Sequence, residues 1–339
     1  MRIPTKIIHK SVSKRLLQNN SSKRVIRRSL HSTCASLSAT STSAPTPTPY
    51  VTQGEKTHFG YENVALEEKE HMVKKVFANV AESYDVMNDV MSLGIHRYWK
   101  DELCKMTALE QMAKIVRSTP ASVASTDRKE ENPALSILDV AGGTGDVAFR
   151  FVEACGSVER SKSSGLDPIQ ITICDINPSM LAVGERRARE MYGNSILDSS
   201  KGLSFSEGNA ECLPFDSNQF DLYTIAFGLR NVTDVDQGLR DAYRVLKPGG
   251  RFMCLEFSHL THPMLQAIYD QYSFHLIPSM GEFIANDKAS YQYLVESIRK
   301  FSNQEDLKGR MENVGFENVS YSNFNQGIVA IHEGWKPLK

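Results

Sequence analysis

From residue 136 onward the chain alternates short apolar runs with amphipathic segments, and this alternation is the feature that most constrains its fold. The apolar runs, several of which contain β-branched residues, are 136–141, 170–175, 203–207, 220–227 and 251–257. Between them the spacing predicts helices over 146–154, 177–192 and 234–246, the last of which ends at the Lys-Pro-Gly-Gly sequence of 247–250. Apolar strands that alternate with helices are typical of a parallel sheet covered on both faces. The sequence therefore predicts an α/β fold.

The regions on either side of this alternation have different patterns. Residues 62–109 have the pattern of helices, and a further helix is predicted over 304–314. Two last strands, 318–324 and 328–332, are close enough in sequence to pair as a hairpin. A dinucleotide-binding fold does not require such a hairpin.

The first 37 residues have the composition of a mitochondrial transit peptide. They contain nine Lys or Arg and no Asp or Glu. Six apolar residues also fall near one face of a helix: Ile3, Ile7, Ile8, Val12, Leu16 and Leu17. The alternative is a basic arm for nucleic acid, but such arms rarely have an apolar stripe. We predict a transit peptide over 1–37 and a Ser/Thr/Pro-rich linker over 38–60.

Charge and cysteine content exclude several classes of protein. Without the nine basic residues of 1–37, the chain has 30 Lys and Arg against 40 Asp and Glu, a formal charge near −10. A phosphate backbone is a poor partner for such a chain, so no nucleic-acid partner is expected. The six cysteines form no C-x-x-C pair, so neither a zinc site nor a disulfide framework is indicated. No apolar run approaches the roughly 20 residues of a transmembrane helix.

A glycine-rich turn follows the first predicted strand, in the sequence Leu138-Asp-Val-Ala-Gly-Gly-Thr-Gly-Asp146. Residues 143–148 loosely satisfy G-x-G-x-x-G/A, so a nicotinamide dehydrogenase is one hypothesis. Asp146 opposes it, because two like charges about 4 Å apart repel by roughly 1 to 4 kcal/mol and a pyrophosphate would lie close by. S-adenosylmethionine has a sulfonium and an ammonium group and no phosphate, so it suits Asp139 and Asp146 better. A third possibility is that the glycines only allow helix and strand to pack closely.

Two further segments are suited to an adenosine. Asp175 ends the second predicted strand, where an acidic residue accepts ribose hydroxyls in either cofactor class. Residues 207–215, after the third strand, offer amide and backbone donors, followed by the apolar Leu213 and Phe215. Neither segment discriminates between the two cofactors.

Two long segments carry a family resemblance. Residues 84–99, from Tyr84-Asp-Val-Met to Arg-Tyr-Trp99, resemble the first signature of the ubiquinone and menaquinone biosynthesis C-methyltransferases. Residues 244–258, beginning Arg-Val-Leu-Lys-Pro-Gly-Gly, resemble the second, and 141–146, 209–211 and 227–232 also match this family. The resemblance spans roughly Lys56 to the carboxyl terminus.

The resemblance implies a fold, a reaction and a set of contacts. The fold is a seven-stranded Rossmann-like S-adenosylmethionine-dependent methyltransferase sheet with an antiparallel last strand, formed by 111–339, with an N-terminal helical cap over 61–110. The reaction is C-methylation of the ring of a polyprenylated methoxy-benzoquinol in ubiquinone biosynthesis, with S-adenosyl-L-methionine as cofactor. The cofactor-binding residues it implies are Gly143, Thr144, Asp175, Asn209 and Ala210. Ala226 stands where family members often have serine, so no contact is predicted there.

The resemblance also implies a location and partners. A polyprenyl benzoquinol substrate resides in a bilayer, so we expect the protein in the mitochondrial matrix, peripheral on the inner membrane surface, in a complex with other ubiquinone-biosynthesis proteins. Apolar residues of the cap and of the region after the fifth strand could line a channel for the tail, each buried methylene contributing about 0.8 kcal/mol. Most of them are expected to be core instead: Met87, Met91, Leu93, Met264, Leu265, Ile268, Tyr272, Phe274, Leu276, Ile277, Met280, Phe283 and Ile284.

Three residues are candidates for catalysis. Arg230 follows the fourth strand, where it could stabilise a phenolate, and the neighbouring Asn231 could orient a hydroxyl group or water. The methylated ring must lose a proton, and His96 or Tyr84 could accept it. The structural alternatives are a surface ion pair for Arg230 and a hydrogen-bonded histidine beside Trp99. Three functions thus remain open: a quinol C-methyltransferase, a nicotinamide dehydrogenase, and a catalytically silent scaffold with the same fold.

Overall fold

The computed structural model describes the chain from Lys56 onward, with several gaps. The described residues are 56–80, 88–89, 92–109, 111–112, 135–154, 169–197, 202–285 and 288–338. The predicted transit peptide, nearly all of the predicted linker and Tyr84 lie outside these residues.

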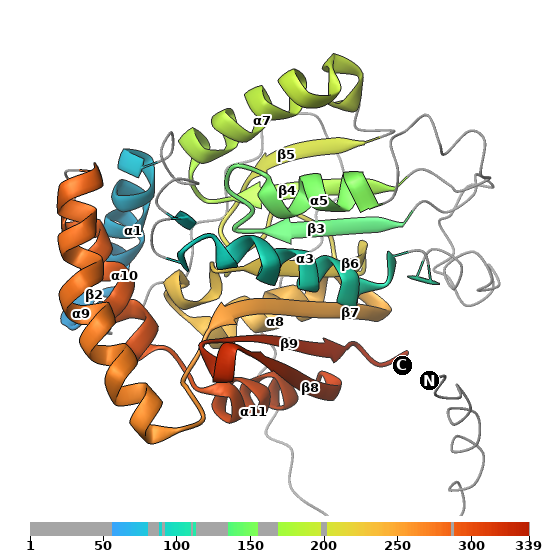
Figure 1. Ribbon diagram of the computed structural model, residues 1–339. Coiled ribbons are helices and arrows are strands. Elements are labelled where there is room, and N and C mark those ends of the chain that lie inside the picture. The colour runs from blue at the N-terminus through green and yellow to red at the C-terminus, as the bar shows by residue number, and fades with distance from the viewer. Residues whose placement is uncertain are drawn as a thin grey trace, which may run out of the picture. The chain divides into compact units, whose positions relative to one another are not determined.

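A seven-stranded sheet forms the centre of the fold, with the strand order β5-β4-β3-β6-β7-β9-β8 (Figure 1). Its strands are β3 (Ser136–Val140), β4 (Gln170–Asp175), β5 (Leu203–Glu207), β6 (Phe220–Ala226), β7 (Leu246–Phe257), β8 (Glu317–Phe324) and β9 (Val329–Trp335). Strands β3 to β7 are parallel, whereas β9 is antiparallel to both of its neighbours, β7 and β8. The predicted seven-stranded sheet, its antiparallel last strand and the terminal hairpin are confirmed.

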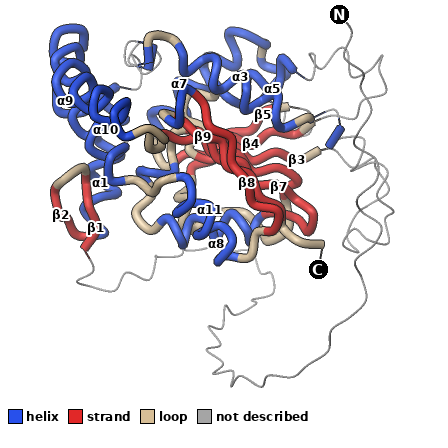
Figure 2. Tube along the Cα trace, turned by 60° about the horizontal axis from the view of Figure 1, so that its bottom comes forward, coloured by secondary structure: helices blue, strands red, loops and turns tan. Residues whose placement is uncertain are grey.

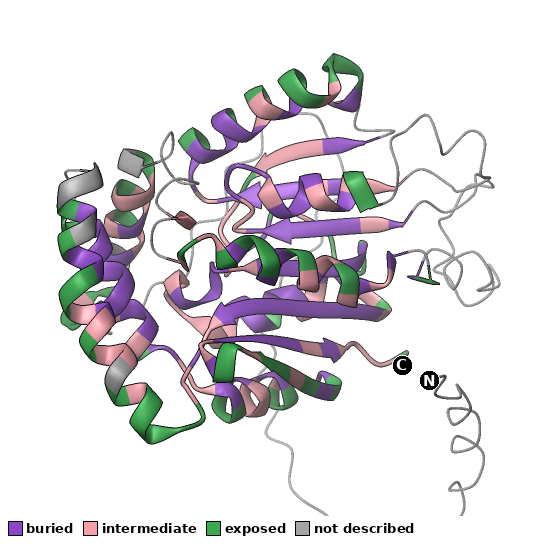
Figure 3. Ribbon diagram, in the orientation of Figure 1, coloured by how far each residue is buried: buried purple, intermediate pink, exposed green. Residues whose placement is uncertain are grey.

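Helices cover both faces of this sheet (Figure 2). Helices α3 (Ile95–Thr107), α5 (Asp146–Ala154) and α7 (Pro178–Tyr192) lie on one face, and α8 (Val235–Val245) and α11 (Gln304–Val314) on the other. The inner strands β3, β4, β6, β7 and β9 are mostly buried, whereas the edge strands β5 and β8 are less so (Figure 3). Consecutive residues of an inner strand face opposite sides of the sheet. Ile137 belongs to the core cluster under the first three helices, and Leu138 to the cluster under the other two. This period of two is expected for a strand that is buried on both faces.

Short polar residues begin three of these helices. The side chain of Asn177 accepts a hydrogen bond from Ser179 N at 3.0 Å, that of Asp234 from Gln237 N at 3.0 Å, and that of Asn303 from Asp306 N at 3.0 Å. Each bond satisfies a backbone donor that the first helical turn leaves unpaired.

The end of α8 differs in part from the prediction. The helix ends at Val245, one residue before the predicted end, and residues 246–250 form the start of β7 instead of a separate turn. Gly249 has φ +77°, and its N–H donates to Lys336 O at 2.8 Å. The pairing of β6 with β7 is irregular between Phe220 and Leu222, which accommodates the Pro-Gly-Gly sequence within the strand.

The amino-terminal region is not a purely helical cap. Strands β1 (Lys56–Phe59) and β2 (Glu62–Ala65) pair as an antiparallel hairpin, and α1 (Leu66–Val80) follows. The prediction that 38–60 is entirely linker was therefore wrong for 56–59. Helices α1, α9 (Pro263–Ala285) and α10 (Lys288–Lys300) stand together at the edge where β3 and β4 end (Figure 1). Helix α3 packs on the sheet instead, because it buries Trp99 and Leu103.

The apolar residues after the fifth strand divide between core and surface. Ile277 packs with Tyr291 and Val295, and the half-buried Tyr272 and Phe274 contact this cluster. Met264, Leu265 and Leu276 on α9, together with Leu93, are exposed. The structure does not describe the side chains of six further residues in the predicted set: Met87, Met91, Ile268, Met280, Phe283 and Ile284. No helix in the described part of the chain is both long and apolar enough to span a bilayer.

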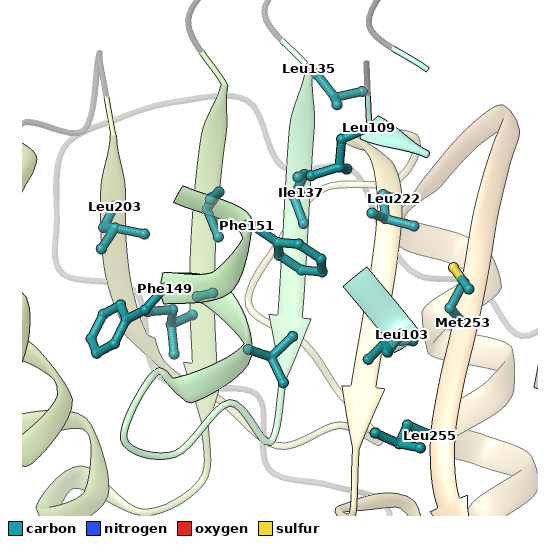
Figure 4. Close-up of a cluster of buried hydrophobic side chains, with 14 of the residues drawn as sticks. Leu103, Leu109, Leu135, Ile137, Phe149, Phe151, Leu203, Leu222, Met253 and Leu255 are labelled. Atoms are coloured by element: carbon teal, nitrogen blue, oxygen red, sulfur yellow. The ribbon is translucent and has the colours of Figure 1, made fainter. Parts of the chain in front are cut away.

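Truncating Leu103 tests whether α3 belongs to the core. Leu103 is fully buried in the cluster drawn in Figure 4. Leu103→Ala should lower the free energy of unfolding by about 2 to 5 kcal/mol, because it removes buried methylenes and leaves a cavity. Ile95→Ala, on an exposed position of the same helix, is the control and should change stability by less than about 1 kcal/mol. Urea unfolding of both variants measures the difference, and equal losses would mean that α3 is not packed on the sheet.

Candidate functional site

A pocket lies at the carboxyl ends of β3, β4, β5 and β6. Its lining comes from 139–144, 146–147, 175–177, 180, 208–211, 226–228 and 231–233, and from side chains of α1 and α3. Open α/β sheets bind ligands at this edge, where the strand order reverses between β3 and β6. The β3–α5 turn and the loop after β6 lie on either side of that reversal.

The five residues predicted to bind the cofactor come together in this pocket. Gly143 and Thr144 line it from the turn after β3, Asp175 from the end of β4, and Asn209 and Ala210 from the loop after β5. The nicotinamide alternative would use the same edge of the sheet, so this convergence locates a ligand site without identifying the ligand.

The turn after β3 has an unusual backbone. Ala141, Gly143 and Gly145 have φ values of 51°, 52° and 84°. A Cβ at Gly142 would lie 2.8 Å from Ile173 Cγ2 and 2.9 Å from Asp139 Oδ2, so only glycine fits there. Left-handed backbone at a residue such as Ala141 costs about 1 to 3 kcal/mol and is concentrated at functional sites.

Asp175 links this turn to α7. Its Oδ2 accepts a hydrogen bond from Gly143 N at 2.9 Å, and its Oδ1 accepts one from Asn177 N at 2.8 Å. Burial raises the pKa of Asp175 to about 6, although these two N–H donors favour the ionised form. The carboxylate therefore holds the glycine turn in place as well as facing the pocket.

The pocket lining is acidic. Among the described residues it contains Glu70, Asp139, Asp146, Asp175 and Glu211 against two basic residues, Lys74 and Lys100. Both lysines are paired within the pocket, Lys74 with Glu70 at 2.9 Å and Lys100 with Asp146 at 2.7 Å. The other three carboxyl groups, those of Asp139, Asp175 and Glu211, have no ion pair with either lysine. A ligand with a sulfonium and an ammonium group fits this set of residues better than a pyrophosphate does.

The role predicted for Asp146 was wrong in one respect. Burial alone would raise the pKa of Asp146, but Lys100 and Arg150 lower it well below its usual range. Lys100 donates to Oδ2, and Arg150 donates to Oδ1 and to the backbone carbonyl. The charge of Asp146 is thus neutralised by the protein itself, and the electrostatic argument against pyrophosphate rests on Asp139, Asp175 and Glu211.

Asp139 keeps an unused acceptor at the pocket wall. Thr224 Oγ1 donates to its Oδ1 at 2.7 Å, whereas its Oδ2 is buried without a hydrogen-bond partner. Burial raises the pKa of Asp139 to about 7, against the opposing effects of Thr224 and Lys100. A cationic ligand in the pocket would favour the ionised form of Asp139.

Two polar side chains join the outer loops of the pocket. Asn209 Nδ2 donates to Glu70 Oε2 on α1 at 3.1 Å, and its Oδ1 accepts from Glu211 N at 2.9 Å. Glu211 Oε1 in turn accepts from Thr233 N at 2.8 Å. These contacts fix the loop after β5 to α1 and to the loop after β6.

Arg230 does not line this pocket. Its side chain is 3% exposed, and its Nη1 donates to Glu256 Oε1 at 2.9 Å and to Phe227 O. The guanidinium carbon lies 5.5 Å from the centre of the Phe257 ring. The neighbouring Asn231 does line the pocket, and its Oδ1 accepts a hydrogen bond from Tyr293 on α10 at 2.9 Å. The geometry therefore favours a buried ion pair behind the pocket wall over a direct contact between Arg230 and a substrate.

His96 is also outside the pocket lining. It lies in the first turn of α3, is 4% exposed, and its Nε2 is 2.9 Å from Asp89 Oδ1. Burial and the nearby Lys100 lower the pKa of His96, and the hydrogen bond to Asp89 opposes them. The structure thus favours the structural alternative for His96, and Tyr84 lies outside the described residues.

The residues that sequence reasoning missed come from helices outside the sheet. Glu70, Val73, Lys74 and Phe77 line the pocket from α1, and Lys100 lines it from α3. The sequence predicts helices over 62–109, and Val73 and Phe77, four positions apart, indicate an apolar helix face but not what that face contacts.

Comparison with known proteins supplies the family context. The model of the ubiE/COQ5 methyltransferase family matches residues 65–336. Proteins named 2-methoxy-6-polyprenyl-1,4-benzoquinol methylase, mitochondrial, are similar to the chain over most of its length. That of Gallus gallus is 47% identical over 307 residues, covering 84% of this chain and 90% of its own. That of Homo sapiens is 46% identical, with 83% and 84% covered, and that of Oryza sativa subsp. japonica is 48% identical, with 83% and 88% covered.

Solved structures resemble the chain more distantly. A S-adenosylmethionine-dependent methyltransferase from Thermotoga maritima, described as a possible histamine N-methyltransferase, has a TM-score of 0.45 and 17% identity, covering 77% of this chain and 98% of its own. The CurJ carbon methyltransferase has a TM-score of 0.42 and 13% identity, covering 68% and 58%. The fold assignment rests on the strand order given above rather than on these likenesses.

Proposed function

The chain belongs to the ubiE/COQ5 methyltransferase family, and we propose that it transfers a methyl group from S-adenosyl-L-methionine to a ring carbon of a 2-methoxy-6-polyprenyl-1,4-benzoquinol. The observation that carries the proposal is the family match over 65–336, because it includes every segment that lines the pocket. The acidic lining of the pocket supports the same cofactor on independent physical grounds.

The residues of the pocket suit S-adenosyl-L-methionine. Asp175 would accept from the ribose hydroxyls, Asn209 and Ala210 would face the adenine, and Gly143 and Thr144 would hold the amino-acid end. Asp139 and Glu211 add negative charge beside a ligand with two positive groups. Once bound, the cofactor supplies an electrophilic methyl group on a positively charged sulfur.

The protein contributes mainly by positioning. Carbon methylation needs the ring carbon at about 3 to 3.5 Å from the methyl group and in line with the leaving sulfur. Phe227 and Asn231 line the pocket beyond the glycine turn, where they would hold the ring. Phe227 has φ +58°, an uncommon conformation for a bulky residue, and Arg230 binds its carbonyl oxygen. We therefore assign Arg230 a positioning role on this wall in place of a direct contact with the phenolate.

Removal of the ring proton needs a base, which can act through water. Tyr84 and His96 remain candidates as proposed from the sequence. The lowered pKa of His96 would keep its imidazole neutral and able to accept a proton near neutral pH. A movement of α3, or a chain of water molecules, would be required to connect it with the pocket.

The location of the protein is part of the proposal. Its relatives are named mitochondrial, and the basic, acid-free segment 1–37 supports import into the matrix by a transit peptide. A polyprenyl tail must be taken from a bilayer, and the exposed Met264, Leu265 and Leu276 on α9 would contact the inner membrane surface. Association with other ubiquinone-biosynthesis proteins is the partner that the family resemblance implies.

One reconstituted assay separates the proposed function from its alternatives. Purified protein, S-adenosyl-L-methionine and a short-tailed methoxy-benzoquinol should yield a product heavier by one methylene unit, with the new methyl on carbon, as determined by mass spectrometry. Binding of NAD with no binding of S-adenosylhomocysteine would indicate a dehydrogenase. Binding of S-adenosylhomocysteine without turnover of the reduced substrate would indicate a scaffold. In cells lacking the protein, the ring species that lacks one carbon-bound methyl should accumulate.

A further inference from the structure

A second cavity lies beside the pocket described above. It is lined by Thr57 and His58 of β1, by α1, by 232–235 after η3 (Leu229–Asn231), and by 300–302 and 310. Its volume is about 330 Å³. Val232 and Thr233 line both cavities, so a single stretch of backbone separates them.

The side chains that line this second cavity are mainly basic. Four of them carry a positive charge: Lys69, Arg230, Lys300 and Arg310. His58 adds an imidazole, and Asp234 is the one acidic residue among the lining residues that the structure describes. Its carboxylate caps α8 by accepting from Gln237 N, and also lies 3.6 Å from Arg240.

The four cations differ in how they are compensated. Arg230 is paired with Glu256 at 2.9 Å, and Arg310 with Asp236 at 2.8 Å. Within the described part of the chain, Lys69 and Lys300 form no ion pair. Lys69 Nζ donates to Val232 O at 3.0 Å, and Lys300 Nζ lies 5.6 Å from the centre of the Tyr61 ring.

Arg230 contributes positive charge to this cluster. Arg230 is 6% exposed and lines the cavity, and its Nε is buried without a hydrogen-bond partner. Because this atom is out of reach of a ligand in the cavity, Arg230 contributes electrostatic attraction to an anion and not a hydrogen bond from its Nε.

The local pKa values are consistent with a surplus of positive charge. Burial lowers the pKa of His58, and the charges of Lys69 and Lys300 lower it further. Burial lowers the pKa of Lys69 to about 8, and the negative charge of Glu211 opposes this shift only in part. Lys69 is only 3% exposed, so water compensates its charge poorly.

We propose that this second cavity binds a phosphate group, presented by a small phosphorylated molecule or by the headgroup of an anionic lipid. Basic side chains line the cavity from β1, α1, α11 and the end of α10. A phosphate offers three or four acceptor oxygens and up to two negative charges, which matches such a set better than the two oxygens of a carboxylate. Lys69, Lys300 and Arg310 line this cavity and not the cofactor pocket, so the phosphate site does not rest on the proposed methyl transfer.

Titration with inorganic phosphate tests the site directly. Calorimetry on the full chain should show saturable binding of phosphate. Lys300→Gln should raise the Kd for phosphate about tenfold, because it removes one charged donor from the cavity lining. Lys300 is exposed, so the substitution should not disturb the fold. Lys288→Gln is the matched control, since it removes the same charge from the other end of α10, outside the cavity lining, and should leave the Kd unchanged. Phosphate should also raise the pKa of His58, measured by NMR with His58→Gln to assign the resonance.

A vesicle experiment identifies the source of the phosphate. Phosphatidylcholine vesicles with and without phosphatidic acid are compared for binding of the same three proteins. Binding that needs phosphatidic acid and is weakened by Lys300→Gln, but not by Lys288→Gln, supports a lipid headgroup. Calorimetric binding without such a vesicle effect supports a small phosphorylated ligand. The proposal is overturned if neither arm depends on Lys300, or if the two variants have equal effects, since equal effects would indicate unspecific attraction of anions.

Discussion

Arg230→Ala should lower the free energy of unfolding by about 3 to 5 kcal/mol, one of the two largest effects that we expect. The substitution leaves the carboxylate of Glu256, whose side chain is 2% exposed, without its counter-charge in the interior. It also removes the donor to Phe227 O at the wall of the cofactor pocket. Chemical unfolding of the purified variant measures the loss. Arg189→Ala is the control, because it breaks a surface pair with Glu185 and should lower stability by less than about 1 kcal/mol.

A double variant distinguishes the structural role of Arg230 from a direct catalytic one. Arg230→Met combined with Glu256→Gln removes both buried charges and keeps an acceptor for Phe257 N. It should recover much of the lost stability, since replacing a buried ion pair by neutral groups is often nearly neutral. If Arg230 only positions the wall, methyl transfer should recover together with stability. A well-folded double variant with turnover reduced about a hundredfold would restore the original hypothesis that Arg230 contacts the phenolate. A loss of less than 1 kcal/mol in Arg230→Ala would contradict the buried ion pair.

The sheet was predictable because its signals are local. Each of β3, β4 and β6 is a short, mainly apolar run with buried residues on both faces, as a sheet with helices on either side requires. Capping by Asn177, Asp234 and Asn303 involves residues two or three positions away, so it too can be read from sequence. The hairpin β1–β2 was missed, because three of the four residues of β2 are exposed and give no alternation of apolar and polar positions.

The partners of the charged residues could not be predicted in the same way. Arg230 and Glu256 are 26 positions apart, and Lys100 and Asp146 are 46 apart, so each pair exists only once the helices and strands have packed. An arginine after a strand at the ligand-binding edge suggests a substrate contact, but whether its side chain faces the ligand or the interior depends on the backbone of residues 227–230. The residues at the strand ends, such as Gly143 and Asp175, were predictable because their place in the sheet alone brings them to the pocket.

Asp175→Asn should weaken binding of S-adenosylhomocysteine by about 1.5 to 3 kcal/mol, or roughly ten- to more than a hundredfold, because an ionised acceptor becomes a neutral amide. The structure adds a second reason. Asp175 uses both carboxylate oxygens on backbone N–H groups, those of Gly143 and Asn177. An asparagine has only one acceptor oxygen and must present its NH₂ group to the other N–H, which disturbs the glycine turn. Calorimetry with S-adenosylhomocysteine measures the change.

Asp221→Asn is a matched control for this variant. Asp221 is also a buried carboxylate that accepts a backbone N–H, from Ser136 at 2.9 Å, but it lies on β6 outside the pocket lining and pairs with Lys247. Asp221→Asn should lower the free energy of unfolding but leave the affinity for S-adenosylhomocysteine unchanged. Unchanged affinity in Asp175→Asn would remove Asp175 from the cofactor site.

The raised pKa of Asp175 gives the same site a pH dependence with a defined sign. In the protein without ligand the carboxyl is ionised above about pH 6 and protonated below it. Since the ionised form is the better acceptor for the ribose hydroxyls, affinity for S-adenosylhomocysteine should fall as the pH is lowered through 6, and Asp175→Asn should not show this step. Asp139, with a pKa of about 7, titrates in the same pocket, so Asp139→Asn is measured alongside to separate the two groups. A pH profile that is identical in the unmutated protein and in Asp175→Asn would contradict the assignment of Asp175 as the titrating acceptor.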